Sequence, residues 1–132
     1  MPTLNLDQAN FADIIDGHEI VLVDFWASWC GPCRMFGPIY EESSDRHPGI
    51  VFGKVDTEAQ PELAAAFQIT SIPTLMAFRD RVIVFAQPGA LPGSMLEDLI
   101  GKIEALDMDD VRRRVAEAEA EAEAEAEAEA EA

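Results

Sequence analysis

The chain has two cysteines, Cys30 and Cys33, and both belong to the segment WCGPC at residues 29–33. A cysteine pair at this spacing can contribute to a metal site, close a structural disulfide, or exchange electrons with another thiol pair. The thiolate is both the metal ligand and the nucleophile, and nearby charges and hydrogen-bond donors decide how easily it forms. The residues around the pair therefore indicate which chemistry applies.

A zinc site would need more ligands than the surrounding sequence supplies. A Cys2His2 site requires two histidines about three to five residues apart after the cysteines. His47 follows the pair, but positions 50–53 hold Ile, Val, Phe and Gly, and His18 lies before the pair. We therefore expect no metal site.

A permanent structural disulfide is also disfavoured. The chain starts MPTLNLDQAN, without the basic and apolar segments of a secretory signal. No apolar run approaches the roughly 20 residues that span a bilayer. We therefore expect a soluble cytoplasmic protein, and in that compartment stable disulfides are rare. Two inert buried thiols remain possible, but the pair lies at a junction between two predicted elements rather than within an apolar face.

Electron exchange fits the local geometry that the sequence predicts. If Cys30 is the N-cap of a helix, Cys33 occupies the third helical position, whose backbone N–H has no intrahelical partner. The Cys30 thiolate can accept that hydrogen bond and gains from the helix dipole, so both effects favour the nucleophilic form. Pro32 is tolerated in the first turn, and Gly31 leaves the sulfur sterically open.

A buried strand is predicted to hold the pair in place. Residues 20–27, IVLVDFWA, form a nearly continuous apolar run that leads to Cys30 and contains one carboxylate, Asp24. After Cys33, apolar residues at helical spacing predict a helix, which Pro38 should kink. Before the run, Asp7 is a candidate N-cap for a first helix, with Leu6 and Phe11 as its hydrophobic staple.

The remaining apolar patterns predict a parallel βαβ arrangement followed by a hairpin. Residues 50–56 are typical of a strand, 61–67 of a short helix, and 74–78 and 82–86 of two hairpin strands. Five apolar residues at helical spacing predict a last helix: Leu96, Leu99, Ile100, Ile103 and Leu106. With an additional strand ahead of the first helix, the class is α/β with a mixed sheet.

The charge of the chain argues against nucleic acid as a partner. The formal net charge is −17, and residues 117–132 are eight Glu-Ala pairs. Removing those eight glutamates leaves −9, so the rest of the chain is acidic as well. A polyanion would be repelled, and we expect neither nucleic acid nor membrane among the partners.

These motifs resemble the thioredoxin family, in its bacterial form with a WCGPC active site. The resemblance rests on VDFWA and WCGPC, then on KVD at 54–56, SIPT at 71–74 and Gly89, and covers roughly residues 3–106. It implies a thioredoxin fold: five strands in the order first, third, second, fourth, fifth, flanked by four helices. Residues 1–106 would form this domain, and residues 107–132 a charged low-complexity tail.

The resemblance also implies catalytic roles for four residues. Cys30 would attack a substrate disulfide, and Cys33, the more buried thiol, would resolve the mixed disulfide and leave a Cys30–Cys33 disulfide. Asp24 matches a buried aspartate that acts as general base toward Cys33. Lys54 matches a lysine near that aspartate, although a residue of this type is also common at the exposed end of a strand.

Substrate binding and the source of electrons follow from the same resemblance. Trp29, Ile72, Pro73 and Gly89 would form the docking surface, with a cis peptide bond before Pro73; for Ile72 and Gly89, core packing and a turn are the alternatives. Gly31 and Pro32 between the cysteines are typical of the reducing members of the family. The resemblance implies that these two residues tune the redox potential of the pair. We expect a monomer without a cofactor of its own, recharged by a flavin-dependent thioredoxin reductase that uses NADPH.

Two positions within the domain depart from the family pattern. Gly37 precedes the kinking proline, where glycine costs about 0.5 to 1 kcal/mol relative to alanine in a helix. The hairpin turn contains Arg81, although such turns commonly require a positive φ that arginine does not tolerate well.

The tail, residues 107–132, departs most from the family pattern. Alanine and glutamate favour a helix, so we expect one exposed helix from about Asp109, started by ion pairs of Asp110 with Arg114 and Arg113 with Glu117. It is either a solvated extension or an acidic arm that selects basic partners. For the whole chain, the leading hypothesis is a protein-disulfide reductase, and the alternative is a binding module whose thiols are incidental.

Overall fold

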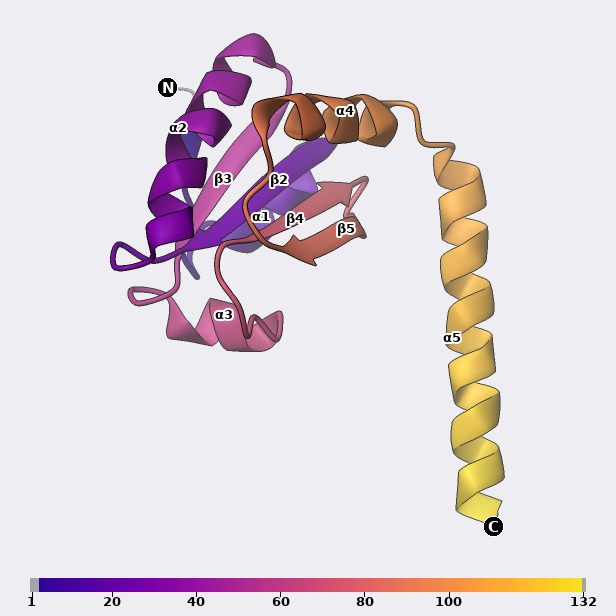
Figure 1. The fold of residues 1–132 in the computed structure, drawn as a ribbon. Helices are drawn as coiled ribbons and strands as arrows, with labels where there is room; N and C mark the ends of the chain where they lie inside the picture. Colours follow the sequence, from indigo (N-terminus) through magenta and orange to yellow (C-terminus); the bar gives the residue numbers. More distant parts are fainter. Residues whose placement is uncertain (1–2, 132) are drawn as a thin grey trace.

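The computed structural model describes residues 3–131, which form a five-stranded sheet, four helices around it and a fifth helix that projects away (Figure 1). The predicted boundaries at residues 1 and 132 lie outside the described residues. The elements in chain order are β1 (Thr3–Asn5), α1 (Phe11–Gly17), β2 (Ile20–Trp26), α2 (Gly31–Arg46), β3 (Val51–Asp56), α3 (Pro61–Ala66), β4 (Thr74–Arg79), β5 (Val82–Pro88), α4 (Gly93–Glu104) and α5 (Met108–Glu131).

The strand order β1-β3-β2-β4-β5 confirms the predicted fold class. β1, β3 and β2 are parallel, whereas β4 runs antiparallel to β2 and β5 antiparallel to β4. β2 therefore lies at the centre of the sheet, and six of its seven residues are buried. This position explains the continuous apolar run, because a central strand is covered on both faces.

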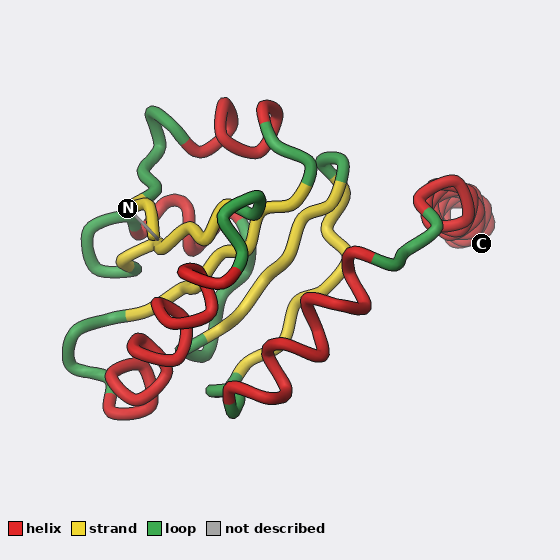
Figure 2. Tube along the Cα trace, turned by 90° about the horizontal axis from the view of Figure 1, so that it is seen from above, coloured by secondary structure: helices red, strands yellow, loops and turns green. Residues whose placement is uncertain are grey.

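Each face of the sheet carries its own apolar cluster. One cluster joins even-numbered residues of β2 to α2 and α4, including Leu22, Phe36, Tyr40 and Leu96. The other joins odd-numbered residues of β2 to α1 and to residues in and after α3, including Phe11 and Phe67. Figure 2 shows these two layers of helix on either side of the strands. Because side chains alternate along a strand, Asp24 belongs to the face that α2 and α4 cover.

The first helix begins later than the sequence predicted. α1 starts at Phe11, and its N-cap, Asn10, makes no side-chain capping bond. Asp7 instead caps the turn before the helix: Asn10 N donates to Asp7 Oδ1 at 2.9 Å, and Asp7 N donates to Asn10 Oδ1 at 2.8 Å. Asp7 therefore accepts the bond that an N-cap residue accepts from the third residue after it, but in the turn that precedes the helix.

The tail is helical and almost entirely exposed, as predicted, but its first turn is attached to the domain. Met108 is buried, with 6% exposure. At the start of the helix, Asp107 Oδ1 accepts a hydrogen bond from the backbone N–H of Asp109 at 3.1 Å. Arg114 pairs with Asp110 as expected, at 3.0 Å, whereas Arg113 also pairs with Asp110 rather than with Glu117.

Candidate redox site

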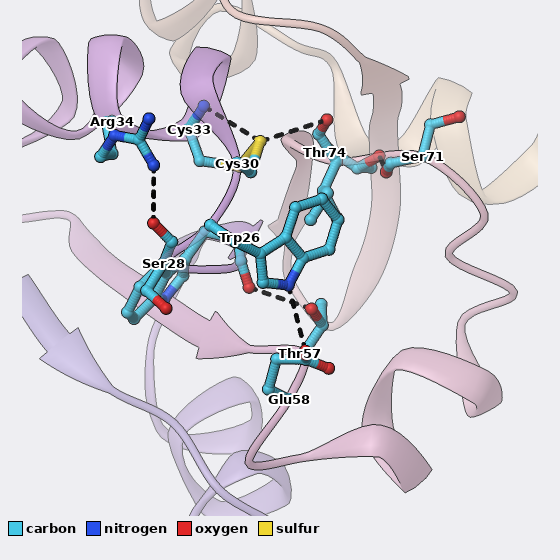
Figure 3. Close-up of a disulfide and its surroundings, with 11 residues drawn as sticks. Trp26, Ser28, Cys30, Cys33, Arg34, Thr57, Glu58, Ser71 and Thr74 are labelled. Carbon is cyan, nitrogen blue, oxygen red and sulfur yellow. Dashed lines mark hydrogen bonds between the residues drawn. A yellow bond between two sulfur atoms is a disulfide. The ribbon is translucent and has the colours of Figure 1, made fainter.

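The cysteine pair lies where the central strand passes into α2. Cys30 is the N-cap of α2 with an extended backbone, and its Sγ accepts a hydrogen bond from Cys33 N at 3.2 Å (Figure 3). Pro32 occupies the first turn, where its missing N–H costs no hydrogen bond. The predicted capping geometry is therefore confirmed, and a thiolate at Cys30 would stand at the positive end of a 16-residue helix.

The two cysteines form a disulfide, with their Cα atoms 5.2 Å apart. Both residues are 5% exposed in this oxidised form, so residue burial does not distinguish the predicted resolving cysteine from the predicted nucleophile. Cys30 is the sulfur beside the loop before β4, since its Sγ lies 3.7 Å from the carbonyl oxygen of Ile72. The asymmetry between the thiols comes from their neighbours rather than from exposed area.

Three loop residues predicted for docking lie together beside Cys30. The Ile72–Pro73 peptide bond is cis, as the resemblance implied. Gly89 N donates to Pro73 O at 2.8 Å, which attaches the loop after β5 to the loop before β4. Gly89 has a φ of 107°, a conformation that L-residues with a side chain rarely adopt.

Trp29 stands out from this surface, with 65% exposure. Its indole Nε1 donates to Glu58 Oε1 at 3.0 Å. The preceding residue, Ser28, is held by Arg34, whose Nη1 donates to Ser28 O at 2.8 Å (Figure 3). The sequence did not predict Glu58 or Arg34 as site residues. Arg34 could have been found from the sequence, because it lies one helical turn after Cys30. No feature of the sequence indicated Glu58.

Asp24 is buried on the face of the sheet that α2 and α4 cover. It is 1% exposed, and neither carboxylate oxygen has a hydrogen-bond partner among residues 3–131. Burial raises the pKa of Asp24 to about 7, and the charge of Lys54 opposes the increase. A carboxylate with this environment can exchange a proton near neutral pH.

Lys54 is the register partner of Asp24 on the neighbouring strand β3. The lysine Nζ lies over the ring of Trp26, 5.0 Å from its centroid. Lys54 therefore approaches Asp24 as a nearby charge rather than as a hydrogen-bonded partner, and it is half-buried rather than an exposed strand end.

The cysteine pair has no grouping of metal ligands around it. Across residues 3–131 no three His, Cys, Asp or Glu side chains are grouped so that they could hold a metal ion. In the same part of the chain, no helix has the length and apolar character to cross a membrane.

Known proteins are similar to this chain in sequence and in fold. The profile of the thioredoxin family, Thioredoxin, matches residues 2–102. A Streptomyces coelicolor protein named "Putative thioredoxin 2" is 60% identical over 115 residues, covering 87% of this chain and 86% of its own. A "Bifunctional thioredoxin reductase/thioredoxin" of Mycobacterium leprae is 45% identical over 55% of this chain and 16% of its own.

A solved structure agrees with the sequence comparison. A mutant thioredoxin from Halobacterium salinarum NRC-1 superimposes with a TM-score of 0.73 at 31% identity, over 79% of this chain and 92% of its own. The matched profile spans the strand, the cysteine pair and the loops that surround it. The chain belongs to the thioredoxin family, and Cys30 and Cys33 are its redox-active pair.

Proposed function

We propose that this thioredoxin-type disulfide reductase acts on protein substrates through a nucleophilic Cys30 and a resolving Cys33. In the reduced protein, the Cys30 thiolate attacks one sulfur of a substrate disulfide. A Cys30–substrate disulfide forms, and the other substrate sulfur leaves as a thiolate. The observation that carries this assignment is the N-cap position of Cys30, where the Cys33 N–H and the helix dipole stabilise negative charge on its sulfur.

The second step completes the reduction. Asp24 accepts the proton of the Cys33 thiol, and the Cys33 thiolate attacks Cys30 Sγ. This attack forms the Cys30–Cys33 disulfide and releases the second substrate sulfur as a thiolate, so two electrons pass to the substrate. A pKa of about 7 suits Asp24 to this role, because a base is most effective when its pKa is close to the working pH. Lys54 adjusts that pKa from the neighbouring strand.

Substrate docking is proposed for the exposed rim around Cys30. Trp29 supplies an exposed apolar surface, and Ile72, Pro73 and Gly89 supply backbone beside the sulfur. Gly31 and Pro32 set the approach to the sulfur and the balance between dithiol and disulfide. Arg34 and Glu58 hold the Trp29 loop in place.

The electrons are proposed to come from NADPH through a flavin-dependent thioredoxin reductase. The Mycobacterium leprae protein, whose name joins a reductase to a thioredoxin, supports this kind of partner. We further propose a cytoplasmic monomer, made of a catalytic domain at residues 1–106 and an acidic tail at 107–132, without a cofactor of its own.

Reduction of insulin disulfides tests the proposal. With a thioredoxin reductase and NADPH, the chain should precipitate the insulin B chain and consume NADPH. The variant with both Cys30→Ser and Cys33→Ser is the control and should do neither. A wild-type chain that accepts electrons from dithiothreitol yet leaves insulin oxidised would contradict the proposed function and favour a binding module.

A further inference from the structure

An apolar groove lies between β5 and α4, beside the redox site but separate from it. Its volume is about 200 Å³, and Met95 on its rim is 53% exposed. The lining residues are Phe85, Gln87, Leu91, Met95, Asp98, Leu99 and Lys102. Four of them are apolar, so burying the surface of the groove under an apolar side chain would be favourable.

Covalent continuity places the groove next to the docking loops. Gln87 and Leu91 line the groove and lie two residues to either side of Gly89. Gly89 N is bonded to Pro73 O at 2.8 Å, and the residue before that proline, Ile72, has its carbonyl oxygen 3.7 Å from Cys30 Sγ. An extended substrate segment of about five residues is long enough to follow this path from the sulfur to Leu91.

The size and chemistry of the groove fit one side chain. Small-molecule sites usually measure about 300 to 1,000 Å³, so a groove of about 200 Å³ is small for a free ligand. The tail does not cover it: α5 stands clear of β5 and of the first turns of α4 in both views (Figures 1 and 2). The groove is therefore open to a segment that docks at Cys30.

We infer that this groove binds an apolar side chain located about five residues from the reacting cysteine of a protein substrate. The inference rests on the proposed function, because the substrate must first engage Cys30. Binding there makes the groove a determinant of substrate choice, favouring disulfides flanked at that distance by leucine, methionine or phenylalanine. Substrates with polar residues there would still react, but less efficiently.

A leucine scan in short disulfide-linked peptides tests this. The host peptide has one cysteine among glycines and serines, and leucine is moved stepwise along each side of the cysteine. Reduced protein is mixed with each peptide dimer, the reaction is quenched with acid, and released thiol is quantified. We expect the second-order rate constant to rise roughly tenfold over the host peptide when leucine reaches the groove, because it then buries apolar area.

Two lysine variants assign the effect to the groove. Met95→Lys should remove the leucine preference, so that leucine and host peptides react at similar rates. Ile83→Lys is the matched control, because Ile83 is also exposed, at 46%, but does not line the groove; it should keep the preference. Equal wild-type rates for all peptides, or a preference that survives Met95→Lys, would overturn the inference, whereas reduction of the host peptide would still support the proposed function.

Discussion

One buried carboxylate and eight exposed ones show how differently the two regions of this chain use charge. Asp24 lies within the sheet at 1% exposure, and burial raises its pKa to about 7. The eight glutamates of the Glu-Ala repeat are exposed along α5, where water and salt screen them. A single desolvated group therefore affects both stability and proton transfer, whereas many solvated ones mainly set the net charge.

The same contrast applies to packing. The domain has apolar clusters on both faces of its sheet, and α5 contributes one buried side chain, Met108, to the described part of the molecule. A further attachment is the Arg112–Asp80 ion pair, at 3.6 Å and partly exposed. Such exposed ion pairs contribute little to the stability of the folded state. The packing of α5 on the domain is therefore confined to the beginning of the helix.

The largest expected effect comes from Asp24→Asn. In the folded protein Asp24 keeps its proton up to about pH 7, whereas in the unfolded chain it loses it near 3.8. The native state thus binds more protons between these values, so its stability falls as the pH rises through them. Asparagine removes that loss: the gain should appear above about pH 4, grow with pH and level off above about pH 7, at roughly 4 kcal/mol.

Urea melts of both proteins at pH 5 and pH 8 measure this difference. The same variant should resolve the mixed disulfide more slowly in stopped-flow turnover, because Cys33 loses its base, while the first attack by Cys30 changes less. Unaltered stability at pH 8 would show that Asp24 is solvated, and the contrast between buried and exposed carboxylates would then disappear.

Met108→Ala should cost about 2 kcal/mol, because it removes the one side chain that the described part of α5 buries. Val115→Ala, about two turns further along, is the matched control and should change the free energy of unfolding by less than about 0.5 kcal/mol. Deletion of residues 116–132 should be equally mild in thermal melts. A large loss of melting temperature on that deletion would mean that the acidic part of the tail packs on the domain.

Arg81→Gly should stabilise the protein by up to about 1 kcal/mol. Arg81 has a φ of 70°, so the conditional prediction that the hairpin turn places it in the left-handed region is confirmed. Glycine relieves the steric cost, and Arg81→Lys, which keeps the charge and the strain, should leave the urea midpoint unchanged. A loss of stability with glycine would show that the unfolded-state entropy it adds is the larger effect.

The smallest expected effect is a gain of about 0.5 to 1 kcal/mol from Gly37→Ala. Gly37 lies inside α2, and beyond the neighbouring backbone of the helix a Cβ there would meet no atom within 4 Å. Gly53→Ala is the opposite case, because its Cβ would overlap the Leu6 side chain and lie 3.3 Å from the Leu22 carbonyl oxygen. Chemical denaturation should therefore rank Gly37→Ala above wild type and Gly53→Ala below it.

The sequence predicted those features that local chemistry determines. The apolar run of β2, the capping of α2 by Cys30 and the positive φ of Arg81 each depend on a few consecutive residues, and the structure contains all three. The cis bond before Pro73 required the family resemblance, because most Xaa-Pro bonds are trans.

Contacts between distant segments could not be predicted in this way. The hydrogen bond of Trp29 to Glu58 depends on where the chain after β3 passes the start of α2, which no local pattern encodes. The pairing of Arg113 with Asp110 rather than Glu117 reflects a choice between partners at i−3 and i+4, which similar energies leave open.

Trapping of mixed disulfides tests the central claim, that Cys30 attacks and Cys33 resolves, most directly. Cys33→Ser should accumulate substrate proteins covalently bound through Cys30, visible on non-reducing gels and released by dithiothreitol, since no resolving thiol remains. Cys30→Ser should trap none, because Cys33 lacks the N-cap position and the adjacent docking loop. Equal trapping by both variants, or trapping by Cys30→Ser alone, would contradict the assignment.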